Sequence, residues 1–126
     1  MKCLSVKQPW INLTALKRKP VELRSWSRTY RGPVILCAGS KVETRWGAKN
    51  YEAGPLGVTI CIAELIDIRP LTPKDFALSC VKANFEEFKD WFGWHWDDIK
   101  RVSPVPVKGQ LGLWEASTEL CSVLRV

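Results

Sequence analysis

The chain has 126 residues, the usual size of a single domain with one hydrophobic core. Its hydrophobic fraction of 46% and charged fraction of 25% are typical of a globular protein and exclude a disordered or fibrous chain. No apolar run approaches the roughly 20 residues that a membrane span needs, and the N-terminal segment lacks the apolar block of a signal peptide. We therefore expect one domain over residues 1–126, located in the cytoplasm and without a membrane partner.

Positive charge is concentrated in the N-terminal part of the chain. The formal net charge is +6, but residues 1–50 hold 11 lysines and arginines against 2 acids, whereas residues 51–126 hold 8 basic and 11 acidic residues. A segment with a charge of +9 is either a solvated basic face or a surface that binds a polyanion. The distribution favours a phosphate-bearing partner such as nucleic acid.

Cysteine and histidine spacing argues against a metal site. The five cysteines form no C-x-x-C pair, and the single histidine, His95, has no cysteine nearby. Cys3, Cys37 and Cys61 lie in apolar, strand-like runs, where a free thiol packs as a small hydrophobe. We expect unpaired structural thiols, a packed or surface histidine, no metal and no cofactor.

The first third of the chain predicts a strand, a helix and a second strand. Lys2–Val6 has the pattern of a strand, and Pro9 suits the first turn of a helix that continues to the basic run before Pro20. Val21–Trp26 then alternates with period two, which places Glu22 and the other even positions on one polar face.

The centre of the chain predicts two longer strands separated by a loop. Val34–Ala38 has the composition of a strand buried on both faces. The glycine-rich stretch from Gly39 to Gly57 is expected to be a loop, and Val58–Ile68 is the longest strand candidate.

Two helix starts and a closing strand follow. Thr72 can cap a helix with Pro73 at its first position, and Asn84 can cap a second helix that Gly93 ends. The aromatic residues 91–96 are then expected to pack as a helix end against the rest of the domain, and Leu111–Ala116 as a closing strand. Because strands and helices do not alternate regularly, we predict an α+β fold, a small mixed β-barrel of five to six strands with two to three inserted helices.

Three segments near the N-terminus resemble the ASCH domain family, whose fold is similar to that of PUA domains. They read LSVKQPW, LKRKPVELRSW and YRGPVIL, and the residues that match the family are Gln8, Pro9, Trp10, Lys19, Glu22, Arg24, Ser25, Trp26, Arg31 and Gly32. The strand at residues 57–67, the RPLT segment and the GQLGLW segment extend the resemblance to about Ala116. One departure is that family members often have a glycine just before the lysine segment at the helix end. This chain has Ala15-Leu16-Lys17-Arg18-Lys19 there, and we align Lys19 with the family's lysine.

The resemblance implies binding of RNA or of a nucleotide in a basic cleft lined by Gln8, Lys19, Glu22 and Arg24. Physical chemistry supports the assignment, because a guanidinium binds phosphate or a base edge in a fork and an indole offers a stacking surface. The alternative is structural: Glu22 forms an ion pair with Lys19 or Arg24, and the tryptophans belong to the core. The candidate binding residues are Ser5, Gln8, Trp10, Lys17, Arg18, Lys19, Glu22, Arg24, Trp26 and Arg31.

A second implication of the resemblance is catalysis, because some ASCH proteins are amidohydrolases of acetylated cytidine and ribonuclease activity has been proposed for others. Lys19 and Glu22 are the candidate acid/base pair. In the amidohydrolases the lysine works with a threonine three residues later, where this chain has Glu22, and with a helix glutamate, for which the nearest acids here are Asp75 and Glu86. A third possibility is a protein-interaction module, as in transcriptional coactivators that carry this domain.

Overall fold

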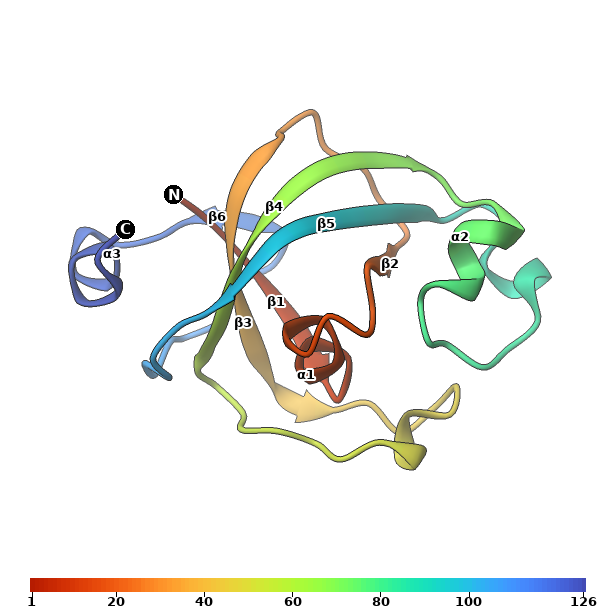
Figure 1. Ribbon diagram of the computed structural model, residues 1–126, viewed down its shortest axis with the longest axis horizontal. Helices are drawn as coiled ribbons and strands as arrows, with labels where there is room; N and C mark the ends of the chain where they lie inside the picture. Colours follow the sequence, from red (N-terminus) through yellow and green to blue (C-terminus); the bar gives the residue numbers. More distant parts are fainter.

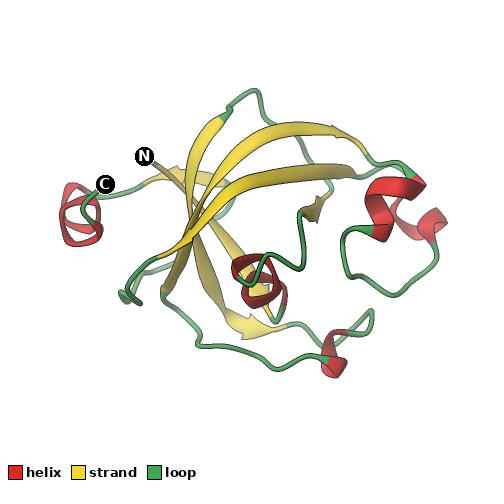
Figure 2. Cartoon of the chain, in the orientation of Figure 1, coloured by secondary structure: helices red, strands yellow, loops and turns green.

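A computed structural model describes residues 1–126 as a six-stranded mixed sheet with short helices (Figures 1 and 2). The strands are β1 (Lys2–Gln8), β2 (Val21–Arg24), β3 (Gly32–Val42), β4 (Thr59–Pro70), β5 (Phe92–Arg101) and β6 (Leu113–Glu115). The α-helices are α1 (Trp10–Ala15), α2 (Pro73–Ala77) and α3 (Thr118–Leu124), and two 3₁₀-helices are η1 (Ala48–Asn50) and η2 (Phe85–Phe88). The predicted α+β fold with a mixed sheet is confirmed.

The strand order is β2-β5-β4-β3-β1-β6, and the sheet curves around α1 (Figure 1). All neighbouring strands are antiparallel except β1 and β3, which run parallel with Cys3 opposite Ile35. A parallel pair needs a crossover connection, which α1 and β2 supply here. The segment that connects α1 to β2 therefore lies over the concave side of the sheet.

The main core fills the space between α1 and the concave side of the sheet. It contains 17 buried residues, among them Ile11 and Leu13 from α1 and Trp94 and Trp96 from β5. A smaller core of four residues on the other side includes Cys3 and is covered by Leu120 of α3. Cys3, Cys37 and Cys61 are buried free thiols, as predicted.

The prediction of a helix end around Trp91 to Trp96 is wrong. The cap pair of Asn84 and Glu87 is present, but it starts only the single 3₁₀ turn η2, and the chain then enters β5 at Phe92. β5 pairs with both β2 and β4 and so lies inside the sheet. Its alternation of buried Trp94 and Trp96 with the less buried His95 is the period of a strand, which burial against the core stabilises.

The helix after Pro9 is also shorter than predicted, because α1 ends at Ala15. Lys17 adopts a left-handed backbone with φ of 62°. Its N–H donates to the carbonyl of Thr14, and the N–H of Arg18 donates to the carbonyl of Leu13. These two hydrogen bonds are the Schellman pattern that ends helices, with Lys17 at the position where glycine is usual.

Three further boundaries differ from the predictions. β3 continues to Val42, so the predicted loop is shorter and contains η1. β2 ends at Arg24, before Trp26, and the closing strand is reduced to Leu113–Glu115. The helix α3 was not expected, although Ser117 caps it by accepting a hydrogen bond from the Leu120 N–H.

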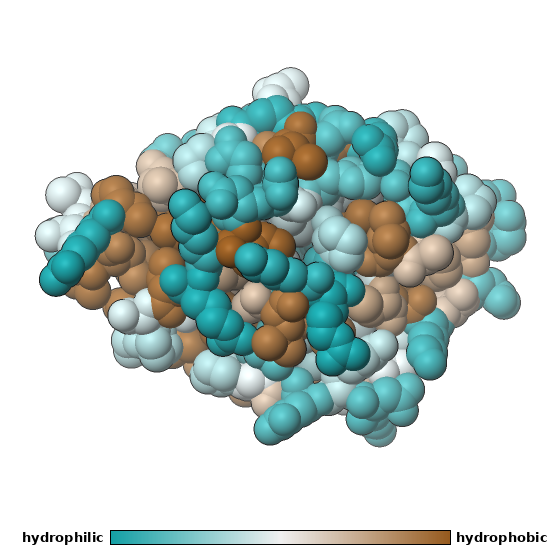
Figure 3. Space-filling view, viewed as in Figure 1, coloured by the Kyte–Doolittle hydropathy of each residue, from teal (hydrophilic) through white to brown (hydrophobic).

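None of the helices has the length and apolar character required to cross a membrane. On the face of the molecule shown in Figure 3, brown apolar patches are interrupted by teal hydrophilic side chains.

Candidate functional site

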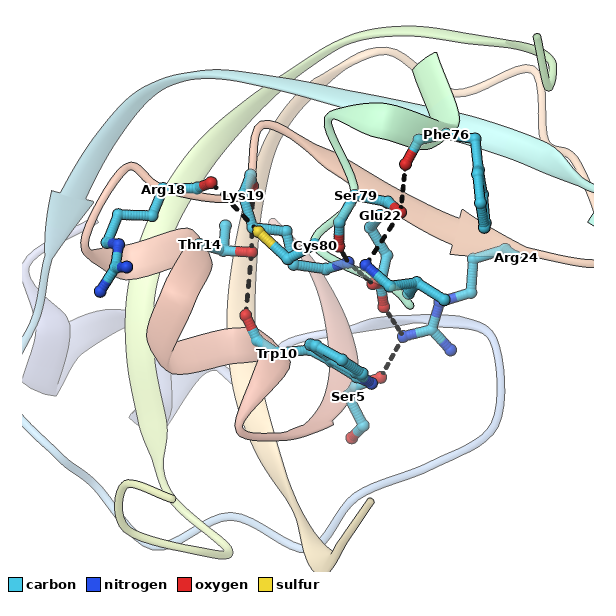
Figure 4. Close-up of polar contacts among 11 residues, drawn as sticks. Ser5, Trp10, Thr14, Arg18, Lys19, Glu22, Arg24, Phe76, Ser79 and Cys80 are labelled. Carbon is cyan, nitrogen blue, oxygen red and sulfur yellow. Dashed lines mark hydrogen bonds and ion pairs between the residues drawn. The ribbon is translucent and has the colours of Figure 1, made fainter. Parts of the chain in front are cut away.

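Lys19 is fully buried beside the concave side of the sheet (Figure 4). The turn after α1 brings it inward, where its Nζ donates a hydrogen bond to the carbonyl of Ser79 and lies 4.8 Å from the ring centre of Trp10. The Nζ is also 3.7 Å from Oε1 of Glu22. A buried ammonium is stable only with such partners, because leaving water costs several kcal/mol.

Glu22 and Arg24 extend this ion pair into a row of three charges. The second carboxylate oxygen of Glu22, Oε2, is 3.1 Å from Nη2 of Arg24. The same Nη2 donates to the carbonyl of Ser5 on β1 at 2.7 Å. The row therefore joins β2 to β1 across the end of α1, and its net charge with all groups ionised is +1.

The pKa of Lys19 is lowered from its usual value. Burial is the main cause, since it disfavours the charged ammonium, and the negative charge of Glu22 opposes that effect. Burial therefore makes the Lys19 proton easier to release than that of an exposed lysine, and the ion pair with Glu22 offsets part of that effect.

The row lies at the base of a cavity of about 830 Å³, which is within the usual size range of small-molecule sites. Six of the ten predicted binding residues line this cavity: Ser5, Trp10, Lys19, Glu22, Arg24 and Trp26. The structural alternative is also realised, because Glu22 is paired with both cations and Trp10 is buried in the main core. The ion pairs and the cavity lining are thus made by the same side chains.

The other four predicted residues do not line the cavity. The buried amide of Gln8 donates to the carbonyl of Pro55 and accepts from the N–H of Asn12, so its polar groups are used within the fold. Arg31 donates to the carbonyls of Arg28, Tyr30 and Ile68. Lys17 and Arg18 are exposed in the turn after α1.

The cavity wall carries more positive than negative charge. Its charged residues outside the row are Lys7, Lys41, Glu43, Arg45 and Lys108. The Arg45 guanidinium donates two hydrogen bonds to the carboxylate of Glu43, at 3.0 and 3.1 Å, and lowers the pKa of Glu43 to about 2. Lys7 also lies near Glu43, with its Nζ 3.9 Å from Oε1. Four cations against one carboxylate leave this part of the wall with an excess of positive charge.

Aromatic rings form the remaining walls. The guanidinium of Arg28 lies 4.4 Å from the ring centre of Trp26, and that of Arg45 lies 3.9 Å from the ring centre of Trp46. Trp46 in turn packs edge-to-face on Phe88 of η2 at 5.1 Å. Both arginines thus make cation–π contacts with indole faces at the cavity.

The sequence did not point to the wall made by Trp46, Phe88 and Trp91, or to the segment from Val107 to Gly112. For the aromatic wall the local signal was the aromatic richness after Asn84, which also suits a core, and the GQLGLW segment was noted only for its resemblance to the family. These residues meet because β5 and the chain after it return to the N-terminal strands. Such long-range contacts cannot be predicted from a local sequence pattern.

A second polar cluster holds α2 against β5, outside the cavity. Asp75 accepts two hydrogen bonds from Arg69, at 3.1 and 3.3 Å, and its Oδ2 lies 3.3 Å from Nε2 of His95. Arg69 lowers the pKa of Asp75, whereas burial lowers the pKa of His95. This places His95 in a packed position and keeps Asp75 away from Lys19.

No group of three or more histidine, cysteine, aspartate or glutamate side chains is arranged to hold a metal ion.

A family model agrees with this sheet and with the segments that carry the buried row. The model of the ASCH domain matches residues 4–103. The chain belongs to the ASCH domain family. The match ends before the GQLGLW segment, so residues 107–112 of the cavity wall lie outside it.

Solved structures support the fold. The crystal structure of ASCH from Zymomonas mobilis superposes with a TM-score of 0.68 at 13% identity and covers 98% of this chain and 92% of that chain. A serine-to-alanine mutant of that protein gives 0.67 at 13% identity, covering 96% and 91%. A tyrosine-to-phenylalanine mutant gives 0.61 at 14% identity, covering 96% and 93%. A comparison with curated proteins gives no match.

Proposed function

We propose that this ASCH domain binds RNA and takes one unpaired nucleotide into the cavity. The observation that carries the proposal is the buried row of Lys19, Glu22 and Arg24 at the base of a cavity with a lysine-bearing wall. A site that combines cations with a carboxylate suits a ligand that has both negative charge and neutral hydrogen-bond donors. A nucleotide has both, in its phosphate and its base.

In this proposal the lysines of the cavity wall bind phosphates, and the buried row binds the base. Lys7, Lys41 and Lys108 attract phosphates, and affinity should therefore fall as salt rises, with a log–log slope of roughly −2 to −4 for a few contacts. Glu22 is a hydrogen-bond acceptor for exocyclic amino groups of a base, and Arg24 is a donor for its carbonyl oxygens. The tryptophans offer faces for stacking.

Arg24→Ala tests the proposal directly. The substitution removes the guanidinium that bridges Glu22 and Ser5, and we expect the affinity for a short single-stranded RNA to fall about tenfold, which is about 1.4 kcal/mol. Affinity is measured by fluorescence anisotropy with a labelled RNA, and the folded fraction by circular dichroism at the same temperature.

The matched control is Arg101→Ala, because Arg101 is an exposed arginine at the far end of β5 and does not line the cavity. Its RNA affinity should stay within twofold of the wild type. Equal losses of RNA affinity in the two variants would show that the RNA is held only by general charge attraction. Unchanged affinity of folded Arg24→Ala would contradict the assignment of the row to RNA binding.

A second candidate function is hydrolysis of an acylated nucleoside, favoured by one observation. Lys19 is a buried lysine with a lowered pKa, and its Nζ lies 3.7 Å from a carboxylate at the base of the cavity. Such a pair is suited to proton transfer. The residues that the family's amidohydrolases add are not matched, because Glu22 replaces the threonine, Asp75 is bound to Arg69, and Glu86 is paired with Lys89 on the surface.

Release of acetate from N4-acetylcytidine distinguishes the two candidates. For a lysine-centred hydrolase, Lys19→Ala should lower kcat/KM about 10²-fold or more in a variant that still folds. Turnover that survives Lys19→Ala would exclude this mechanism. RNA binding without turnover in the wild type would leave the binding function alone.

A further inference from the structure

Leu111 is an apolar side chain that the fold leaves completely in solvent beside the cavity. It is 99% exposed, the most exposed large hydrophobic residue of the chain. It belongs to the segment from Val107 to Gly112, which forms one wall of the cavity. An isolated exposed leucine is ordinary on a protein surface, but a leucine at the mouth of a binding cavity is placed to touch whatever lies outside the bound group.

Two glycines fix the path of this segment. A Cβ at Gly109 would lie 2.8 Å from Oγ of Ser5, so only glycine lets the chain pass this close to β1. Gly112 has φ of +70°, a left-handed backbone that favours glycine. In Figure 4 the segment is the violet ribbon that curves past Ser5 and Arg24. The close approach at Gly109 and the turn at Gly112 carry Leu111 past the cavity wall into solvent.

Positive charge is found at a residue that precedes Leu111 in the chain and beside the glycine that follows it. Lys108 precedes it on the same segment and lines the cavity. The Nη2 of Arg28 would be 3.7 Å from a Cβ at Gly112, and the same guanidinium covers Trp26. An apolar tip near two cations suits the surface of a nucleic acid helix, where stacked bases lie between two phosphate backbones.

We propose that Leu111 inserts into the base stack of a double-helical RNA when a nucleotide from that stack enters the cavity. Resting on the proposed RNA-binding function, the inference defines the substrate class as duplex RNA with a single unpaired, bulged nucleotide. A nucleotide that leaves the stack opens a gap between its neighbours, and a branched apolar side chain can fill that gap. An extended single strand offers no such gap, so Leu111 has nothing to fill there.

The experiment compares two labelled RNAs in fluorescence anisotropy: a hairpin with one bulged nucleotide and a single strand that contains the same unpaired nucleotide. For the wild type we expect tighter binding of the bulged hairpin. Leu111→Ala should weaken hairpin binding about five- to tenfold and leave single-strand binding within twofold, since only the hairpin contact loses buried apolar surface. Because Leu111 is wholly exposed, the substitution does not disturb the core.

A fluorescent adenine analogue placed beside the bulge gives a second readout. Its fluorescence should rise when wild-type protein binds, because insertion of Leu111 separates it from its stacking neighbour, and the rise should be lost in Leu111→Ala. Val123→Ala is the control, since Val123 is 60% exposed on α3 and does not line the cavity.

The outcomes separate this inference from the function on which it rests. Single-strand binding that Arg24→Ala reduces, together with equal hairpin affinity of the wild type and Leu111→Ala, would overturn the insertion while leaving RNA binding intact. Failure of the wild type to bind either RNA at low salt would overturn both.

Discussion

At the scale of single residues, two buried carboxylates in the cavity wall are each paired with an arginine. Glu22 and Glu43 are 8% and 7% exposed in their side chains, and each has an arginine nitrogen within about 3 Å, at 3.1 and 3.0 Å. An unpaired carboxylate at either place would be costly to bury and would repel a phosphate. The arginines therefore stabilise the buried carboxylates and offset their negative charge in the cavity.

Glu43→Gln is expected to destabilise the protein in a pH-dependent way. The folded-state pKa of Glu43 is about 2, below its usual value of 4.5, so the ion pair contributes fully above pH 4.5 and its contribution is lost as the pH falls toward 2. With solvent screening of the exposed Arg45, we expect a loss of about 1–2 kcal/mol at pH 7.

Urea unfolding at several pH values measures this difference. The gap in unfolding free energy between wild type and Glu43→Gln should narrow between pH 4.5 and pH 3. Glu52→Gln, at an exposed glutamate without an ion pair, should match the wild type throughout. A gap that stays constant with pH would show that Glu43 acts through its shape and not through its charge.

Sequence reasoning located the buried row but not every residue around it. Glu22 and Arg24 share a face as alternate strand positions, whereas Lys19 was named through the family resemblance, and the structure brings the three together. Gln8 was expected in the cleft, yet its amide binds Pro55 and Asn12. Which partner a buried amide finds depends on loops distant in sequence, and no local pattern contains that information.

At the scale of elements, the sequence predicted where helices begin more reliably than where they end. Thr72 caps α2 and Asn84 caps η2, as predicted, but both turns end early. Phe85, Phe88 and Phe92 have helical spacing, yet Phe92 begins a strand. A central place between two strands satisfies the backbone hydrogen bonds of β5, which overrides local propensity.

Lys17, at the end of α1, has a left-handed backbone conformation that favours glycine. Lys17→Gly should stabilise the protein by about 1 kcal/mol, because glycine adopts φ of 62° without the steric cost that a Cβ imposes. The free energy of urea unfolding at neutral pH measures the effect. Lys17→Ala removes the same charge and retains the Cβ, so it should remain close to the wild type. Equal stabilisation by both substitutions would assign the gain to the lost charge.

At the scale of the whole molecule, only part of the positive charge in the N-terminal half of the sequence lies free on the surface. Of the basic residues in the first 50, Lys19 is buried, and Arg24 and Arg45 are paired with carboxylates. Lys7 and Lys41 contribute to the cavity wall, and Lys108 joins them from the acidic part of the chain. The net charge thus supports the proposed partner class, whereas the location of the candidate site required the fold.

The position of β1 in the sheet limits how much of the fold can form while the chain is being synthesised. β1 emerges first, but one of its two neighbours is β6, whose Glu115 pairs with Lys2. Pairing between such distant segments forms late. A nascent chain that has reached only Ser103 has no residues 107–112 to wall the cavity, and the β6 side of β1 is bare. The full cavity wall is therefore present only after residues 107–112 have been synthesised, and a chain that lacks β6 carries an open strand edge that can pair with another chain.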